Sequence, residues 1–251
     1  MGNDIAASRL DMDRHYVSSW FRDAATLAKA VGVATAELGE MTAAGCAPGT
    51  IYAFSKEHGW WSALAGHRDG HDGPPPPDAE CWFAPAAAWW LRRAVLARRE
   101  GASFETAARR NQAVFENEFV AALAQLPEAR IAFADCFDAN GAIAAAASKR
   151  AAQEWADWIK GGYAVCLRIF TGETCVRKEA LAALLKRHIA DPQSCPMTAA
   201  EALSACERLA HLMLPFAPWQ RPHCTPGVTI DRLLADLDLG REFPFGSPVA
   251  G

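Results

Sequence analysis

Residues 198–215, TAAEALSACERLAHLMLP, carry the clearest secondary-structure signal in the chain. Their apolar side chains recur at steps of three and four residues, which places them on one face of a helix: Leu203, Cys206, Leu209, Ala210, Met213 and Leu214. Thr198 and Glu201 have the spacing of a capping box, in which each side chain bonds the backbone amide of the other residue. Pro215 predicts the end of the helix. Such a helix buries its apolar face against neighbouring elements.

The same periodicity predicts two further helices, within residues 112–126 and 181–189. Alternating patterns typical of strands are scarce. Only Thr50–Phe54 and Cys81–Phe83 are candidates, and they suffice for at most a small β-hairpin. The sequence therefore predicts an all-α fold, in which an N-terminal helix-turn-helix-like module packs on a C-terminal helical domain.

The composition is that of an ordinary globular protein. Of the 251 residues, 51% are hydrophobic and 22% are charged, which excludes a disordered chain. The 25 basic and 29 acidic residues leave a formal charge of −4, so no chain-wide positive field attracts nucleic acid or anionic lipid. The first residues lack a signal-peptide pattern, no uninterrupted apolar run reaches about 18 residues, and the eight cysteines include no CxxC pair. These features predict a cytoplasmic protein with reduced cysteines and no membrane partner.

One irregular stretch interrupts the helical pattern. Gly66–Asp78 contains glycines, charged residues and four successive prolines at 74–77, so we interpret it as an exposed loop. A softer boundary lies at Pro127. We therefore expect a first module at residues 20–126 and a second domain, which carries the candidate site, at residues 130–240.

Residues 25–48 have the pattern of a helix-turn-helix. A short helix stops at Gly32, where the turn favours a residue that tolerates positive φ, and Thr35 then caps a second helix. With the sequence Gly45-x-x-Pro48 after that helix, the stretch resembles the DNA-binding module of the MerR transcriptional regulators. The resemblance covers about residues 22–118, and it implies a regulator that senses a ligand.

The chemistry of this module argues against sequence-specific DNA recognition. A recognition helix brings basic or amide side chains to base edges, but residues 35–44 contain Glu37 and Glu40 and no basic residue. Arginines gather further on, in what we interpret as a solvated helix face: Arg92, Arg93, Arg98, Arg99, Arg109 and Arg110. We interpret the tryptophans as core or interface residues, with an aromatic cage as the alternative: Trp60, Trp61, Trp82, Trp89 and Trp90. We expect no specific DNA binding, and a partner protein would dock on this tryptophan-rich module.

Two groups of side chains have the chemistry of metal ligands. His67-x-x-x-His71 is flanked by glycines that argue against a helix, so we interpret it as part of a solvated loop rather than a metal site. His211 with the pair His223-Cys224 is equally unspecific. The chain contains no phosphate-binding loop, dinucleotide fingerprint or Gly-x-Ser-x-Gly elbow. The sequence therefore predicts no metal site, and the cofactor is unknown.

The stretch 154–179 is the most informative about function. Arg168 lies inside an apolar run, where a charge needs a partner such as Glu173. Thr171 or Thr174 begins the next helix, and the free N–H groups of a helix start attract carboxylates and phosphates. The alternative is a structural turn without a ligand, in which Arg168 is paired internally with Glu173 or Glu179.

A second polar segment, Ala217–Asp231, is stiffened by three prolines and a glycine, and it carries Arg221, His223, Thr225 and Asp231. Phe216–Asp231, together with Gly161–Arg168 and Thr171–Glu179, resembles an uncharacterised bacterial family associated with natural-product biosynthesis. The resemblance implies a role in secondary metabolism, but no established mechanism or catalytic residues.

We therefore expect a small-molecule biosynthetic enzyme, or a metabolite-binding protein, of bacterial natural-product metabolism, with its site between the two polar segments. The residues expected to bind an anionic ligand are Arg168, Thr171, Thr174, Arg177, Lys178, Arg221 and Asp231. The expected catalytic residues are Glu173 and His223, which would transfer protons. Cys166 and Cys175 are weaker candidates for a nucleophile. Both lie among apolar residues, so a buried, inert thiol is the alternative for each. Two other classes stay open: a MerR-like, ligand-sensing regulator, and a non-catalytic partner of a biosynthetic enzyme.

Overall fold

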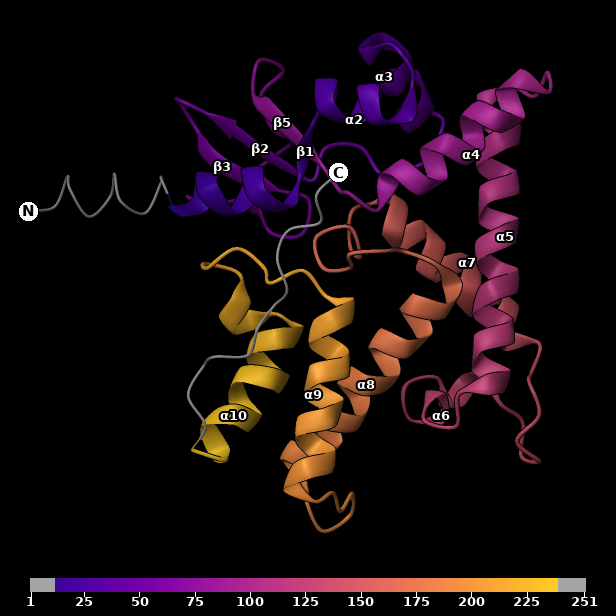
Figure 1. Cartoon of the computed structure of the whole chain (residues 1–251), viewed down its shortest axis with the longest axis vertical. Helices are drawn as coiled ribbons and strands as arrows, with labels where there is room; N and C mark the ends of the chain where they lie inside the picture. Colours follow the sequence, from indigo (N-terminus) through magenta and orange to yellow (C-terminus); the bar gives the residue numbers. More distant parts are fainter. Residues whose placement is uncertain (1–11, 239–251) are drawn as a thin grey trace, which may run out of the picture. The chain divides into compact units, whose positions relative to one another are not determined.

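The computed structural model describes residues 12–238, which form two compact units (Figure 1). The first unit contains the described residues up to Ala113 together with Ala156–Val165. The second contains Val114–Trp155 and the described residues from Cys166 onward. The boundary therefore lies within helix α5 (Phe104–Gln125), whereas the sequence analysis placed it at residues 126–130.

The first unit contains a five-stranded antiparallel sheet in the order β1-β5-β2-β3-β4, so the predicted all-α fold is wrong and the fold is mixed. The strands are β1 (Arg22–Asp23), β2 (Tyr52–Ser55), β3 (Gly59–Ser62), β4 (Gly66–His67) and β5 (Glu80–Phe83). Two of these strands have two residues and three have four, and four is the shortest length over which alternation can be recognised. The sheet also depends on pairing between β2 and β5, which are separated by a long loop.

Two short helices follow β1, and a tight turn joins them. Asp23 caps α2 (Ala24–Val31) by accepting a hydrogen bond from Thr26 N at 2.8 Å. Gly32 ends this helix with φ +82°, a left-handed conformation that glycine adopts without strain, so the predicted turn is confirmed. Helix α3 (Thr35–Ala43) begins one residue earlier than expected, because Ala34 rather than Thr35 is in the cap position, and it has no side-chain cap.

Aromatic side chains form the core of the first unit. The ring centres of Trp60 and Trp82 are 5.4 Å apart, and both residues are buried. Trp90 is buried on α4 (Ala87–Arg99), where its carbonyl accepts a hydrogen bond from Asn111 Nδ2 at 2.9 Å. Trp61 is half-buried and Trp89 is 52% exposed. Three of the five tryptophans therefore serve the core as expected.

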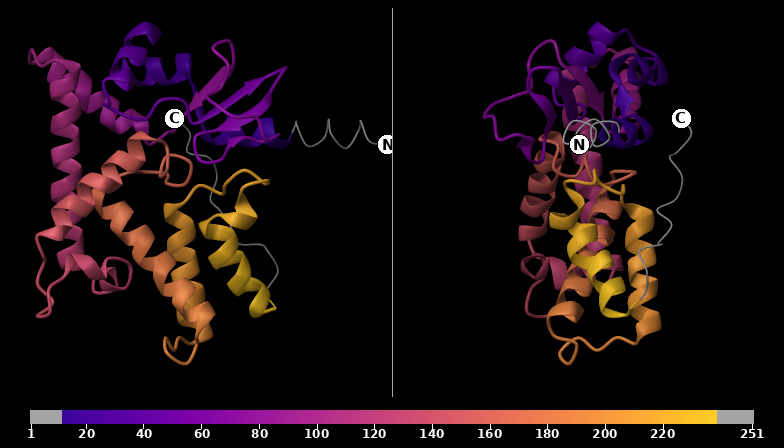
Figure 2. Two further views of the ribbon diagram at one scale, coloured as in Figure 1. Left: turned by 180° about the vertical axis from the view of Figure 1, so that it is seen from behind. Right: turned by 90° about the vertical axis from the view of Figure 1, so that its left-hand side faces the viewer.

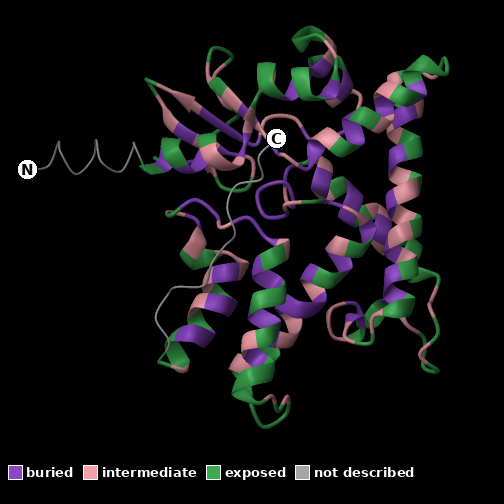
Figure 3. Ribbon diagram, viewed as in Figure 1, coloured by how far each residue is buried: buried purple, intermediate pink, exposed green. Residues whose placement is uncertain are grey.

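The second unit is helical, apart from two isolated strand-like bridges. After α5 its elements are α6 (Ala129–Ala132), the 3₁₀ turn η1 (Ala134–Cys136), α7 (Ala146–Ile159), α8 (Gly172–Ala190), α9 (Ala199–Leu212), the 3₁₀ turn η2 (Arg221–His223), the π-helical turn η3 (Gly227–Asp231) and α10 (Arg232–Asp236). The last turn of α7, from Ala156 on, belongs to the first unit. Helix α8 is the centre of this unit, because it packs against α6, α9 and η3 (Figures 1 and 2). The buried faces of α8 and α9 appear in purple in Figure 3.

The predicted starts of α8 and α9 are confirmed. Thr171 caps α8, and its side chain and that of Thr174 bond each other's backbone amides. Thr198 and Glu201 form the expected capping box at α9. The ring of Phe170, just before α8, stacks on that of Phe115 with centres 4.7 Å apart, which fixes the start of α8 on α5. No helix among residues 12–238 has the length and apolarity required to span a membrane.

Candidate ligand-binding groove

A groove of about 390 Å³ lies on the second unit, between the end of α5 and helices α8 and α9. Its lining combines charged and apolar side chains: Leu126, Glu128, Arg177, Leu181, Glu207, Arg208, His211 and Leu212. The three leucines give it apolar walls, and Leu181 is 3% exposed and belongs to the core. Because an apolar wall with a few polar groups is typical of small-molecule sites, this groove is the candidate functional site.

Two arginines reach the groove, and each forms an ion pair with a carboxylate. Arg177 Nη2 lies 2.7 Å from Glu173 Oε1, one turn earlier on α8. Arg208 Nη2 lies 3.2 Å from Glu128 Oε1. Both arginine side chains are at least half exposed, and exposed pairs contribute little to stability because water screens them. An anionic ligand can therefore replace either carboxylate at small cost.

His211 adds a titratable group to the same groove. Its Nδ1 lies 2.8 Å from the carbonyl oxygen of Glu207, one turn earlier on α9. A carbonyl only accepts, so Nδ1 carries the proton, and in the neutral ring Nε2 has a free lone pair. His211 is thus oriented to accept a proton or a hydrogen bond from a molecule in the groove.

Arg168 does not pair with Glu173 as expected, because the Glu173 carboxylate bonds Arg177 instead. The Nε of Arg168 donates to the carbonyl of Met213 at 2.8 Å, and its backbone N–H donates to Leu212 at 3.1 Å. These bonds tie the segment before α8 to the end of α9. Thr171 and Thr174, also expected as ligand contacts, serve the α8 cap.

Arg221 and Asp231 lie close together, but they form an ion pair with each other rather than an open binding site. Arg221 donates to both carboxylate oxygens of Asp231, at 2.8 and 2.7 Å, and to the carbonyl of Pro215 at 2.6 Å. This clamp closes the proline-rich segment on itself and uses the donors that a ligand would need. His223 is exposed and is not among the residues that line the groove.

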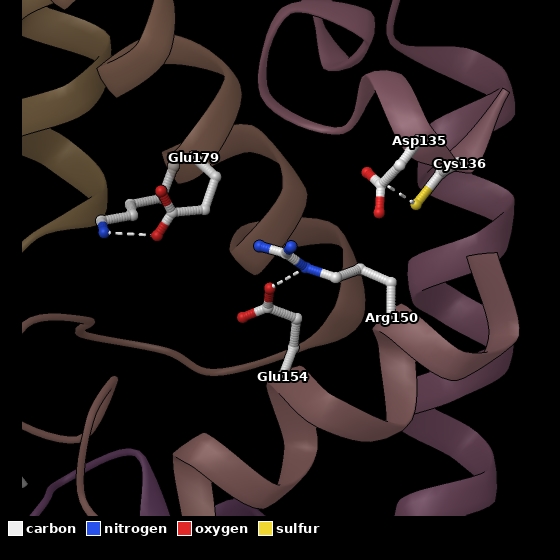
Figure 4. A network of polar contacts seen from close by, with 6 residues as sticks. Asp135, Cys136, Arg150, Glu154 and Glu179 are labelled. Carbon is white, nitrogen blue, oxygen red and sulfur yellow. Dashed lines mark hydrogen bonds and ion pairs between the residues drawn. The ribbon is translucent and has the colours of Figure 1, made fainter. Parts of the chain in front are cut away.

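Lys178 and the two cysteine candidates are buried, and Lys178 pairs with Glu179, which is labelled in Figure 4. Lys178 Nζ bonds Glu179 Oε1 at 2.6 Å. Burial alone would lower the pKa of Lys178, but the ion pair with the Glu179 carboxylate raises it, so the amine is protonated at neutral pH. Burial raises the pKa of the Cys166 thiol to about 12, and Cys175 is fully buried. A neutral, enclosed thiol is a poor nucleophile, which favours the inert alternative.

A second buried pair escaped the sequence analysis. Glu154 on α7 is 3% exposed and accepts a hydrogen bond from Arg150 Nε at 2.5 Å (Figure 4). The guanidinium of Arg150 also lies 5.3 Å from the ring centre of Phe133. The i,i+4 spacing of Arg150 and Glu154 was the available signal, but it is equally common on solvated helix faces.

The chain belongs to DUF6058, a family of unknown function, which matches residues 111–238, just over half of the chain. All the residues that line the groove fall within this match. No curated protein and no solved structure has significant similarity to the chain. The likeness to MerR regulators and the link to natural-product biosynthesis therefore have no support from these comparisons.

Expectations about macromolecular partners of the first unit stay predictions. Helix α3 carries Glu37 and Glu40, and Arg92 uses its Nε and Nη2 to bond the Ala30 carbonyl at 3.1 and 2.9 Å. On α4, Trp89 and Leu96 are 52% and 55% exposed, seven residues apart on one side of the helix. The acidic α3 accords with the expected lack of specific DNA binding, and the exposed apolar side chains of α4 accord with a docked partner protein.

Proposed function

We propose that the second unit binds a small organic anion in the groove between α5, α8 and α9. The observation that carries the proposal is the convergence of Arg177, Arg208 and His211 on a groove with leucine walls. A ligand with a carboxylate or phosphate and an apolar body matches this lining. The guanidinium groups bind the anion, and contact with the leucines removes the apolar surface of the ligand from water.

Ligand entry exchanges partners rather than breaking buried contacts. The anion takes the place of Glu128 beside Arg208, or of Glu173 beside Arg177, and the displaced carboxylate side chain rotates into the solvent. Planar guanidinium groups bind carboxylates and phosphates through two parallel hydrogen bonds, which favours these anions over chloride.

The orientation of His211 supports a second candidate, an enzyme that acts on the same ligand. With Nδ1 bonded to the Glu207 carbonyl, Nε2 is the atom that accepts a proton from a bound substrate.

The enzyme would belong to bacterial natural-product metabolism, as the sequence resemblance implies. All eight cysteines are free thiols, which supports a place in the reducing cytoplasm.

Binding of anilinonaphthalene sulfonate, followed by its fluorescence, tests the proposal. This dye joins a sulfonate to aromatic rings, so it matches both parts of the lining. We expect one saturable site per chain and a Kd at least about tenfold weaker in Arg208→Ala, since a lost charged hydrogen bond costs about 1.5–3 kcal/mol.

Arg187→Ala is the matched control, because Arg187 is exposed on α8 but does not line the groove. It should bind the dye as the parent does. Equal affinities for the parent, Arg208→Ala and Arg187→Ala would show that the dye binds elsewhere and that the groove is not an anion site.

A further inference from the structure

Three histidine rings of the first unit lie close together. His58 is in the turn between β2 and β3, His67 is on β4, and His71 is in the loop that follows. The ring centre of His58 is 6.0 Å from that of His67 and 5.3 Å from that of His71, and the last two are 6.0 Å apart. The sequence analysis interpreted His67 and His71 as part of a solvated loop, but His67 is only 7% exposed.

The hydrogen bonding of His67 leaves it in the form that binds metals. Its Nε2 lies 3.3 Å from the carbonyl oxygen of Pro74, which only accepts, so Nε2 carries the proton. In the neutral ring, Nδ1 then has a lone pair, and this atom is buried without a hydrogen-bond partner. Metal-bound histidines commonly donate their other N–H to a backbone carbonyl, as His67 does here.

His58 presents a second atom of this kind. Its Nδ1 is buried and has no hydrogen-bond partner, and the Glu57 carboxylate lies 4.0 Å away, beyond hydrogen-bond reach. Buried polar atoms without partners are rare in folded proteins, so two in neighbouring rings require an explanation. A cation bound by both atoms satisfies the two lone pairs at once.

The separations of the rings agree with a common ion. Metal–nitrogen distances of about 2.0–2.1 Å place the ring centres of histidines around a tetrahedral ion roughly 5 Å apart, within about 1 Å of the observed values. A Cβ on Gly59 would lie 3.1 Å from Asp69 Oδ2, so this carboxylate lies beside the residue that follows His58 in the chain and is a candidate for the fourth ligand. No three donors between residues 12 and 238 already surround one point, so the rings must turn about their side-chain torsions to bind.

We propose that His58, His67 and His71 bind one divalent transition-metal ion such as Zn²⁺, with Asp69 or water in the remaining position. Imidazole is the preferred ligand of Zn²⁺, Cu²⁺ and Ni²⁺ rather than of Mg²⁺ or Ca²⁺. The three histidines come from the β2–β3 turn, from β4 and from the loop before β5. The ion therefore fastens the proline-rich loop to the β2–β3 hairpin.

The test is a calorimetric titration of the full chain with Zn²⁺, after chelator treatment to remove bound metal. We expect one ion per chain and a rise in the melting temperature on binding. His71→Ala should weaken the affinity at least about tenfold, because it removes one ligand. His71 is exposed, so this variant tests binding without disturbing the core even if His67→Ala fails to fold.

His15→Ala is the matched control, since His15 is exposed in the same unit and remote in sequence from the three rings. It should bind Zn²⁺ with the affinity of the parent. The proposal is overturned if the parent binds no Zn²⁺ at about 100 μM, a weak limit for a built site. It is equally overturned if His71→Ala and His15→Ala bind with the same affinity as the parent.

Discussion

Arg221 has the chemistry of a ligand contact, but its hydrogen bonds to Asp231 and Pro215 serve the fold. The side chains of Arg221 and Asp231 are 20% and 23% exposed, so their bidentate pair is partly shielded from water. We expect Arg221→Ala to lower the free energy of unfolding by about 2–3 kcal/mol, because it leaves the Asp231 carboxylate and the Pro215 carbonyl without a donor. Dye binding by the folded variant should not change.

Urea unfolding of the variant measures this loss. Arg232→Ala is the matched control, since its ion pair with Asp236 is exposed on both sides and should contribute less than about 1 kcal/mol. If Arg221→Ala instead keeps its stability and loses dye binding, Arg221 is a ligand residue and the clamp is incidental.

At the scale of single residues, sequence reasoning located caps better than it located the site. Thr171 and Thr198 were predictable because a cap depends on neighbours within one helical turn. The groove draws its lining from three distant segments, 126–128, 177–181 and 207–212, and of its residues only Arg177 was an expected ligand contact. Spacing along the chain carries no information about such an assembly.

At the scale of elements, Gly172 decides how closely α8 approaches α5. A Cβ at this position would lie 2.1 Å from Phe119 N and 2.5 Å from Phe115 O, and both are backbone atoms that cannot turn aside. We expect Gly172→Ala to lower the free energy of unfolding by about 3 kcal/mol or more, since α8 must shift as a whole. Gly39→Ala, within α3 and with nothing within 4 Å of the added Cβ, should instead stabilise by about 0.5–1 kcal/mol.

Denaturant unfolding of both variants distinguishes close packing from helix propensity. Two glycines in helices then have opposite effects, although propensity alone predicts a gain for each. A Gly172→Ala variant as stable as the parent would mean that α8 is less closely packed on α5 than the structure shows.

The same contrast between local and distant contacts explains why the sheet was missed. Helices α8 and α9 were predictable from periodicity and caps, since their hydrogen bonds connect residues four apart. The two strand candidates in the sequence became β2 and β5, which pair with each other through Tyr52 and Trp82. Their pairing spans the proline-rich loop. Strands β1 and β4 have two residues each, too few to show a pattern, and β3 has the sequence GWWS, in which apolar and polar residues do not alternate.

At the scale of the whole molecule, the buried cysteine thiols make the free energy of unfolding depend on pH in the alkaline range. Burial raises the pKa of Cys46, Cys136 and Cys206 to about 11 and that of Cys166 to about 12, from an ordinary value of 9.0. These cysteines are distributed over both units. The effect is therefore a property of the chain rather than of one site.

The direction of this coupling follows from which state ionises first. Between pH 9.0 and about 11 the unfolded chain loses thiol protons that the folded chain retains. The free energy of unfolding therefore has its full value below pH 9.0 and decreases as the pH rises through this range. Cys206→Ala removes one such group from the core of α9, so at pH 7 it should cost about 1 kcal/mol in lost packing. Its stability should then fall less steeply than that of the parent, and urea unfolding at a series of pH values from 7 to about 10.5 measures both slopes. Parallel curves for parent and variant would show that the Cys206 thiol ionises as readily in the folded chain as in the unfolded one.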